Sequence, residues 1–350
     1  MIPASTFAGQ TVAVFGLGGS GLAACRSLRA GGAAVAAWDD GRAACERAAG
    51  DGITVVDLGK SDWSTFSALV LAPGVPLTHP EPHWTVKRAH AARVPVIGDT
   101  EVLFREWTAS QAKPQIIAIT GTNGKSTTTA LTGHVLSFAG LRVAIGGNIG
   151  TPALSLPSFE DIDIYVLEFS SYQIDLTPSL APSVGVLLNV TPDHIDRHGT
   201  VENYAAIKSR LVEVAQRAVV AIDDNWTQMA MAKCRAAGVE SVSIATRNDE
   251  ADVVARDGAF SVPLSVVRQK ATDAQNTDVA SFSTSNAIAL RGAHNTQNAM
   301  AAVVASLMTD CVGSSALQAA LETFPGLAHR MQPIARLGNV LFVNDSKATN

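Results

Sequence analysis

The stretch IIAITGTNGKSTTT, residues 116–129, decides the fold expected for this chain. It has a short apolar strand, a glycine turn and the polar start of a helix, an arrangement typical of phosphate cradles. The usual pattern G-x-x-x-x-G-K-[ST] requires glycine at position 119, where this sequence has Ile119. The remainder of the pattern is present, so the stretch predicts a phosphate-binding loop between a strand and a helix.

The residue types in this loop suit a nucleoside triphosphate. Gly121 and Gly124 allow the loop to turn its N–H groups inward, and Lys125 can reach the β- and γ-phosphates. The hydroxyl of Ser126 or Thr127 can ligate Mg²⁺. The alternative interpretation is a solvated lysine that follows an ordinary turn.

A second glycine-rich turn stands roughly a hundred residues earlier. Residues 16–21 read G-x-G-x-x-G directly after an expected strand and before an expected helix. Asp39 and Asp40 follow about twenty residues later, at the end of the next expected strand, where they could accept hydrogen bonds from a ribose or a base. The turn predicts a site for a nucleotide diphosphate without specifying NAD, and a tight turn with no ligand is the alternative.

Strand and helix patterns alternate along most of the chain, which predicts an α/β fold with parallel sheets. We expect a Rossmann-like domain at 1–100, a central P-loop ATPase-type domain at 101–327 and the start of a C-terminal domain at 328–350. The last expected strand, 339–343, has nothing to pack against before the chain stops, so we expect a truncated C-terminal domain. The strands expected in the first domain are 11–15, 33–38, 53–56, 68–72 and 94–97.

Composition excludes several classes of protein. The 350 residues carry 26 basic and 31 acidic side chains, a balance that argues against a general nucleic-acid or membrane-surface binder. The four cysteines are scattered without a CxxC pair, so neither a disulfide framework nor a zinc site is expected. The sequence shows no signal peptide and no apolar run of membrane-spanning length, so we expect a cytoplasmic protein.

The order of short motifs along the chain resembles the Mur ligase family. The resemblance covers essentially the whole sequence, although family members have a further C-terminal domain. NDSKATN favours the member that adds D-glutamate to UDP-N-acetylmuramoyl-L-alanine. The motifs are G-x-G-x-S-G at 16–21, TGTNGKST at 120–127, GGNIG at 146–150, LEFSSYQ at 167–173, TPDHIDRH at 191–198, YAAIK at 204–208, HNTQN at 294–298, AHR at 328–330 and NDSKATN at 344–350.

The resemblance implies that the first turn binds the UDP of the sugar-peptide substrate and the second binds ATP. It also implies an acyl phosphate on the L-alanyl carboxylate, which the amine of D-glutamate attacks. The implied UDP-substrate contacts are Gly18, Gly19, Ser20, Gly21, Asp39, Asp40 and Asn148. The implied ATP contacts are Gly121, Thr122, Asn123, Gly124, Lys125, Ser126, Thr127, Asn295, Asn298, Arg330, Asp345 and Lys347. Thr349 is implied as a D-glutamate contact.

The resemblance further implies two Mg²⁺ sites, with Ser126 and Glu168 at the first and His194 at the second. Lys208 is implied to be carbamylated, which would turn a cation into an anion able to ligate the metal. Lys125, Glu168, His194 and Lys208 are the implied catalytic residues.

The residues themselves support these roles unequally. Glu168 ends an apolar strand, where a carboxylate suits Mg²⁺, although a solvated edge glutamate is the alternative. His194 and His198 are four residues apart, but no third soft ligand is near, and we expect structural roles for Asp193, Asp196 and His198. Without the resemblance, Lys208 would be read as a solvated helical lysine.

Other functions remain open at this level. A nicotinamide dehydrogenase would explain the first turn but not the second. Another Mur ligase or a folylpolyglutamate synthetase is a nearer alternative, and a non-catalytic binding fragment is a third. We expect a monomer that binds UDP-N-acetylmuramoyl-L-alanine but forms little product without its C-terminal domain.

Overall fold

The structure is a computed structural model that describes residues 1–267, 279–330 and 332–346. It divides into two compact units, each made of separate stretches of the chain. Unit 1 comprises Met1–Pro114, Gly146–Ala181 and Thr191–Arg210, and unit 2 comprises Gln115–Ile145, Pro182–Val190 and Leu211–Asn350. The domain division expected at 100/101 and 327/328 stays a prediction.

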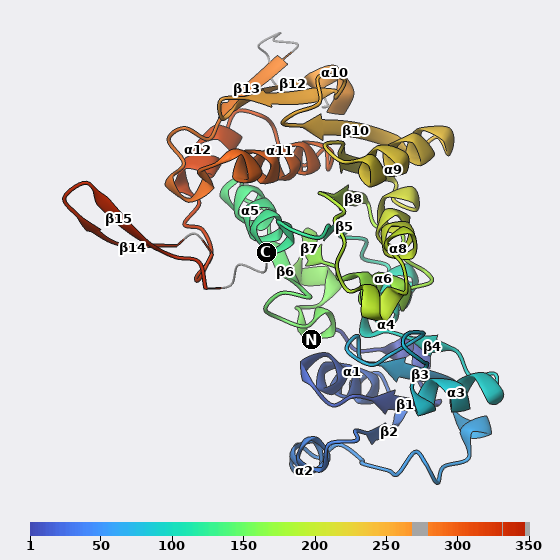
Figure 1. The fold of residues 1–350 in the computed structure, drawn as a ribbon. Coiled ribbons are helices and arrows are strands. Elements are labelled where there is room, and N and C mark those ends of the chain that lie inside the picture. Colours follow the sequence, from blue (N-terminus) through green and yellow to red (C-terminus); the bar gives the residue numbers. More distant parts are fainter. Residues whose placement is uncertain (268–278, 331, 347–350) are drawn as a thin grey trace. The chain divides into compact units, whose positions relative to one another are not determined.

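A four-stranded parallel sheet is the centre of unit 1 (Figure 1). Its spatial order is β2-β1-β3-β4, which confirms the predicted N-terminal parallel sheet. The strands are β1 (Thr11–Phe15), β2 (Ala34–Trp38), β3 (Ala68–Leu71) and β4 (Val96–Ile97).

The strand expected at 53–56 is wrong. Val55 makes only an isolated bridge to Ala37 of β2. The N–H of Ile53 instead bonds to the carbonyl of Ala48, at the end of a helix. The segment 53–56 therefore bridges to the sheet edge at one residue, because Ile53 is still hydrogen-bonded to the preceding helix.

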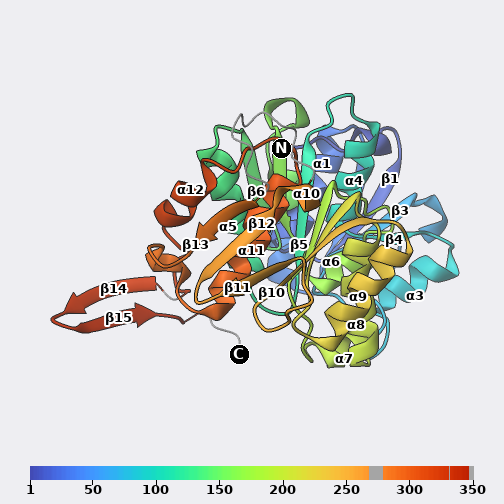
Figure 2. The ribbon, with the colours of Figure 1, turned by 90° about the horizontal axis from the view of Figure 1, so that it is seen from above.

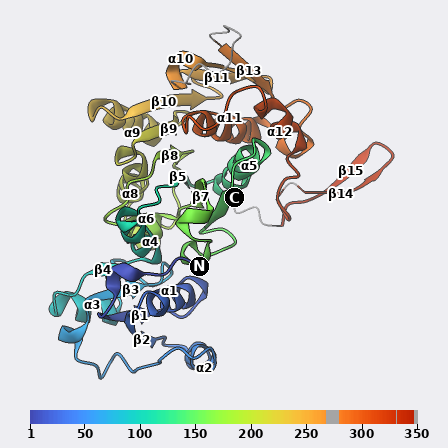
Figure 3. The same cartoon turned by 180° about the vertical axis from the view of Figure 1, so that it is seen from behind.

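Helices pack on the strands of this sheet. Helix α3 (Trp84–Ala91) inserts Val86 and Ala89 into a buried cluster with Phe15, Leu69 and Leu71. Helix α1 (Gly19–Ala30) packs against β1, β2 and β3 (Figure 3). The other helical elements of residues 1–114 are η1 (Ser5–Phe7), α2 (Arg42–Gly50), η2 (Trp63–Thr65) and α4 (Asp99–Ala109).

The remaining stretches of unit 1 hold several of the predicted site residues. Strand β7 (Ile164–Glu168) is buried along its whole length and ends at Glu168. A capping box formed by Ser170 and Gln173 then starts helix α6 (Ser171–Asp175). The other elements here are η3 (Ala153–Ser155), η4 (Phe159–Asp161), α7 (Ile195–His198) and α8 (Val201–Glu213), whose last three residues fall in unit 2.

Unit 2 contains a mixed sheet in which strands follow the order β13-β12-β11-β10-β9-β8-β5. Neighbours from β5 to β11 pair in parallel, and β12 and β13 add antiparallel pairs. The strands are β5 (Gln115–Thr120), β8 (Val184–Leu187), β9 (Arg217–Ala221), β10 (Glu240–Ala245), β11 (Val253–Arg256), β12 (Ala259–Pro263) and β13 (Val279–Ser283). Strand β6 (Val143–Gly147) contains the sequence boundary between the stretch of unit 2 that ends at Ile145 and the stretch of unit 1 that begins at Gly146.

The central helix of unit 2 is α11 (Ala293–Leu307), which is buried almost throughout. It packs against α5 (Lys125–Phe138) and against the strands β8 to β12 (Figure 2). Its position brings the HNTQN segment next to the phosphate-binding loop, about 170 residues away in sequence. The other helical elements of unit 2 are α9 (Asn225–Ala236), α10 (Leu264–Val267), η5 (Ile288–Leu290) and α12 (Leu317–Thr323).

The expected final strand has a partner, contrary to the sequence interpretation. Strand β15 (Val340–Asn344) pairs with β14 (Gln332–Leu337) in an antiparallel hairpin whose turn contains Gly338 at φ 58°. Apolar side chains of this hairpin are 38% to 74% exposed.

In the part of the chain that the structure describes, no helix combines the length and apolar character needed to span a membrane.

Candidate functional site

The first glycine turn adopts the close geometry that its sequence predicts. Gly16 has φ 91°, and a Cβ at Gly21 would collide with the carbonyl oxygen of Gly16. Helix α1 begins at Gly19, and its N-cap Gly18 has an extended backbone and no side-chain cap. A Cβ built on Gly18 would meet no described atom within 4 Å, so the space in front of the helix start is open.

The acidic pair after β2 shapes this turn. The carboxylate of Asp39 accepts hydrogen bonds from the N–H of Leu17 and of Gly41, both at 2.7 Å. Asp40 is exposed and lies 3.1 Å from Nε2 of His83 and 3.4 Å from Nε1 of Trp84. Asp39 thus holds the turn through the backbone, a role that the sequence interpretation missed, while Asp40 remains open to a ligand.

The phosphate-binding loop of unit 2 is held by its own backbone and by Asn189. Gly121 and Gly124 have φ 155° and 84°, which glycine tolerates and other residues resist. Lys125 donates from Nζ to the carbonyl oxygens of Gly121 and Thr122, at 3.0 and 2.7 Å. Asn189 accepts from the N–H of Asn123 at 2.8 Å and donates to its carbonyl at 3.1 Å.

A cavity of about 320 Å³ opens beside this loop. It brings together predicted ATP contacts that are far apart in sequence: Asn123, Gly124, Thr127, Asn295, Asn298, Arg330 and Asp345. The sequence interpretation did not include the other lining residues: Asn189, Ala289, His294, Gln297, Gly326 and Leu327. Asn189 could have been found, because it follows a buried strand at the sheet edge where ligands of parallel sheets bind.

Asn298 connects α11 to the loop. Its Oδ1 accepts from the hydroxyl of Thr128 at 3.2 Å, and its Nδ2 donates to Oδ1 of Asn295 at 3.1 Å. A Cβ at Gly124 would lie 2.5 Å from Oδ1 of Asn298. The loop therefore needs glycine at position 124 both for its backbone angle and for this approach.

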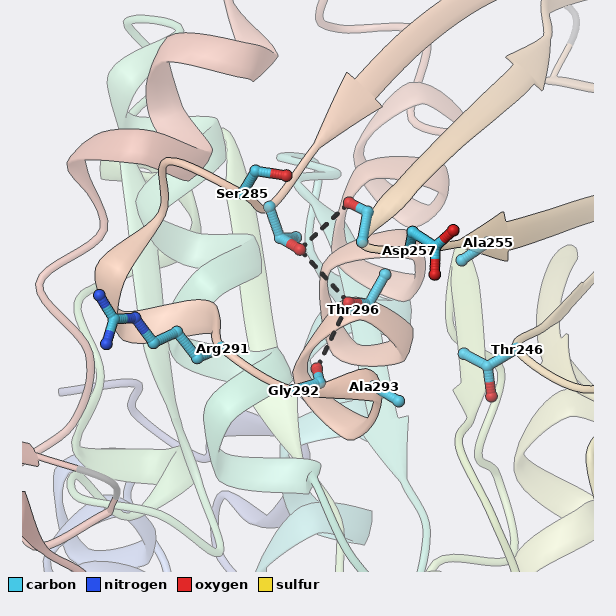
Figure 4. A pocket seen from close by; sticks show the side chains of 10 residues that line it. Thr246, Ala255, Asp257, Ser285, Arg291, Gly292, Ala293 and Thr296 are labelled. Atoms are coloured by element: carbon cyan, nitrogen blue, oxygen red, sulfur yellow. Dashed lines mark hydrogen bonds between the residues drawn. The ribbon is translucent and has the colours of Figure 1, made fainter.

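A second cavity in unit 2, of about 440 Å³, contains none of the predicted site residues (Figure 4). In it the hydroxyl of Thr296 donates to the carbonyl of Gly292 at 3.3 Å (Figure 4). The hydroxyl of Thr284 donates to the carbonyl of Gly258 at 3.1 Å and lies 3.3 Å from that of Thr296. Asp223 connects the linings of the two cavities. Its carboxylate accepts hydrogen bonds from Thr246 of this cavity and from Gln297 of the first. The cavity lies beside the start of α11, from which Ala293 and Thr296 line it.

Glu168 is 2% exposed, and its Oε2 has no hydrogen-bond partner among the described residues. Its Oε1 accepts from Nδ2 of Asn148 at 2.7 Å, and its carbonyl accepts from the N–H of Asn148 at 2.9 Å. A buried carboxylate oxygen without a partner is costly, and a cation would satisfy it. Glu168 thus fits a Mg²⁺ ligand, and Asn148, predicted as a substrate contact, orients it.

The other predicted metal residues of unit 1 gather around aromatic rings. His194 has a left-handed backbone, φ 52°, and its ring lies 5.3 Å from that of Tyr172. Lys208 on α8 is 2% exposed, and its Nζ lies 4.8 Å from the ring centre of Tyr204. Lys208 is therefore buried, contrary to the solvated lysine that its sequence context alone indicates.

His198, expected to be structural, is equally buried. Its Nε2 lies 2.8 Å from the hydroxyl of Ser171. Burial lowers the pKa of His198 to about 4, helped by the positive charges of neighbouring groups that include His194 and Lys208. The imidazole is therefore neutral at pH 7.

Two predicted contacts, Lys347 and Thr349, lie outside the described residues. Ser126 and Thr127 stand in the first turn of α5, as expected for a P-loop. Within residues 1–267, 279–330 and 332–346, no group of three His, Cys, Asp or Glu side chains could hold a metal ion. A cation here would need oxygen ligands from a substrate as well as from the protein.

The family model and the most similar relatives agree on one family. The family model for the Mur ligase middle domain matches residues 119–306. The UDP-N-acetylmuramoylalanine–D-glutamate ligase of Nitrobacter hamburgensis is 51% identical over the whole chain, which spans 74% of that relative. The ligase of the same name from Agrobacterium fabrum is 49% identical, again over the whole chain and over 72% of the relative.

Solved structures share the fold at lower identity. A UDP-N-acetylmuramoyl-L-alanyl-D-glutamate–2,6-diaminopimelate ligase has a TM-score of 0.58 and 22% identity, covering 81% of this chain and 65% of that one. A ligase from Neisseria meningitides that acts on UDP-N-acetylmuramate, by its title, has a TM-score of 0.57 and 18% identity, covering 91% and 99%. Identities this low support the fold alone.

Proposed function

The chain belongs to the Mur ligase family, and from that premise we propose that it joins D-glutamate to UDP-N-acetylmuramoyl-L-alanine. The enzyme is an ATP-dependent ligase of peptidoglycan precursor synthesis. The proposed route passes through an acyl phosphate on the L-alanyl carboxylate, which the amine of D-glutamate attacks. We place this reaction in the cytoplasm and assign it to a monomer.

One observation carries the proposal. The 320 Å³ cavity collects the phosphate-binding loop, the start of α11, Arg330 and Asp345 around one space. Backbone N–H groups and a lysine suit the phosphates, while Arg330 adds a rigid fork of donors. A carboxylate such as Asp345 suits ribose hydroxyls. A dehydrogenase would have no use for this second cradle.

The UDP of the other substrate is assigned to the first turn. Gly18 leaves open space before the positive end of α1, where a diphosphate is stabilised by N–H groups and by the helix dipole. Asp40 is exposed and able to accept from ribose or base. Asn148 remains a proposed contact of the sugar-peptide.

Mg²⁺ supplies charge neutralisation to the phosphates when it is bound. Glu168 is a proposed ligand because its Oε2 is buried without a partner among the described residues. Ser126 is a proposed ligand because its hydroxyl stands in the first turn after the loop. His194 and a carbamylated Lys208 are proposed for a second Mg²⁺, and Thr349 for D-glutamate.

The test of the proposed function is titration with the Mg²⁺ complex of a non-hydrolysable ATP analogue. We expect saturable binding that Lys125→Met abolishes while leaving the affinity for UDP-N-acetylmuramoyl-L-alanine unchanged. Any UDP-N-acetylmuramoyl-L-alanyl-glutamate detected by mass spectrometry should require both ATP and D-glutamate. Absence of nucleotide binding, or product made equally from L-glutamate, would contradict the proposal.

A further inference from the structure

The ring of Tyr172 is enclosed by three nitrogen-bearing side chains of one segment. His198 stacks on it with the ring centres 5.1 Å apart and the planes inclined by 15°. His194 approaches at 5.3 Å and 49°. The guanidinium of Arg197 lies 4.8 Å from the ring centre, and its Nη1 donates to the carbonyl of Gly74 at 2.8 Å.

His198 is the most confined of these side chains. Its Nε2 is 2.8 Å from the hydroxyl of Ser171, and its carbonyl accepts from Nδ2 of Asn203 at 2.8 Å. Its ring lies 5.4 Å from that of Tyr204, which is 1% exposed. A side chain held on three sides in a close-packed interior cannot shift without moving its neighbours.

These contacts form one continuous path. Tyr204 and Lys208 are one turn apart on α8, and Nζ of Lys208 lies 4.8 Å from the ring centre of Tyr204. The order of contacts is therefore His194, Tyr172, His198, Tyr204 and Lys208. Both ends of the path are residues assigned above to the second Mg²⁺.

His194 also has a backbone that needs support. Its left-handed φ of 52° is uncommon for a residue with a side chain and persists only where the surroundings hold it. The carbonyl of His194 accepts from the N–H of His198 at 3.1 Å, so both backbone and rings connect the two histidines.

We propose that His198 is a positioning residue that sets the placement of His194 and Lys208 through the rings of Tyr172 and Tyr204. This inference rests on the proposed function, because it assumes that His194 and Lys208 serve the second metal site. A positioning role of this kind requires no contact of His198 with substrate or metal. Groups behind the ligands of a metal typically change its affinity 10- to 100-fold when they are altered.

The test compares His198→Leu, which removes the aromatic ring, with His198→Phe, which keeps an aromatic ring at the same position. Mn²⁺ replaces Mg²⁺, and its affinity is measured by electron paramagnetic resonance with the ATP analogue present to supply oxygen ligands. We expect His198→Leu to weaken Mn²⁺ about 10-fold and His198→Phe to bind like the unmodified chain. The control His90→Leu changes an exposed histidine of α3 and should have no effect.

A second pair of variants guards against misfolding. Tyr172→Leu should weaken Mn²⁺ as His198→Leu does, and Tyr172→Phe should not, with thermal melts establishing that each variant is folded. A second readout is the ¹³C signal of a Lys208 carbamate formed from ¹³CO₂, which should fall in the Leu variants and vanish in Lys208→Arg. Unchanged Mn²⁺ affinity in both folded Leu variants, or equal loss in the Phe variants, would overturn the inference.

The failure of the proposed second metal site has a different signature. If His194→Ala does not weaken Mn²⁺ in the otherwise unmodified chain, the second metal site is wrong and the positioning role falls with it, while the ATP site is tested separately by titration with the analogue. If His194→Ala weakens Mn²⁺ while His198→Leu does not, only the positioning role is wrong.

Discussion

At the scale of single residues, Gly18 offers the sharpest test of the first turn. Its φ of −76° is allowed to any residue, and a Cβ there meets no described atom within 4 Å. Gly18→Ala should therefore fold normally but put a methyl group where the diphosphate approaches. We expect at least a ten-fold loss of affinity for UDP-N-acetylmuramoyl-L-alanine, about 1.4 kcal/mol, measured by calorimetry.

Gly50→Ala is the matched control for this substitution. Gly50 ends α2 in the same unit and also has open space at its Cβ position. Its substrate affinity should equal that of the unmodified chain. Equal affinity of Gly18→Ala and Gly50→Ala would mean that the first turn does not hold the diphosphate.

Asp99 gives a prediction about stability. It is buried at the start of α4, and neither carboxylate oxygen has a hydrogen-bond partner among the described residues. Burial raises the pKa of Asp99 to about 6, from an ordinary value of 3.8. The favourable contribution of the protonated form is thus complete below pH 3.8 and is lost as the pH rises through 6.

Asp99→Asn should therefore stabilise the protein at pH 7 by an amount on the order of 1–3 kcal/mol. The gain should shrink to near zero at pH 4, where the native aspartate is protonated in the fold. Urea unfolding at both pH values measures the difference. A variant that is less stable than the unmodified chain at pH 7 would show that the buried carboxylate has an unrecognised role.

Several single residues show which features could be predicted from the sequence and which could not. The types and spacing of Gly121, Gly124 and Lys125 predicted the loop, because a phosphate cradle imposes local requirements. The hydrogen bond from Leu17 to Asp39 depends on how β1 and β2 pair, which no local pattern states. The burial of Lys208 depends on the packing around α8 in the same way.

At the scale of elements, the capping box before α6 connects the end of β7 to the rings around Tyr172. The hydroxyl of Ser170 accepts from the N–H of Gln173 at 3.2 Å, and Oε1 of Gln173 accepts from the N–H of Ser170 at 3.1 Å. Ser170→Ala should lower the free energy of unfolding by about 1 kcal/mol, because the first turn of a short helix loses its acceptor. Ser170→Thr keeps the acceptor and should lose much less. Denaturant titration of both variants measures the difference, and equal stabilities would contradict a role for the cap.

Most elements were predictable because their periodicity is strong. The strand expected at 11–15 is confirmed as β1, and the helix expected directly after the phosphate-binding loop is confirmed as α5. The strand expected at 53–56 did not form, because the N–H of Ile53 bonds back to the carbonyl of Ala48 in α2. The partner of β15 was missed because the hairpin depends on a turn at Gly338 rather than on a run of apolar residues.

At the scale of the whole molecule, each unit carries one of the two proposed nucleotide sites, and the described residues of each site lie within that unit. The first turn and Asp39 belong to unit 1, and the 320 Å³ cavity belongs to unit 2. The proposal therefore predicts opposite effects of two variants. Lys125→Met should lose the ATP analogue and keep the UDP substrate, and Gly18→Ala should do the reverse. A joint loss in either folded variant would contradict separate sites.

The central claim is that the glycine turn at 16–21 binds UDP for a ligase rather than NAD for a dehydrogenase. Calorimetric titration of the chain with UDP-N-acetylmuramoyl-L-alanine, and separately with NAD⁺, tests it most directly. We predict saturable binding of the UDP substrate and no binding of NAD⁺. Binding of NAD⁺ without binding of the UDP substrate would contradict the account.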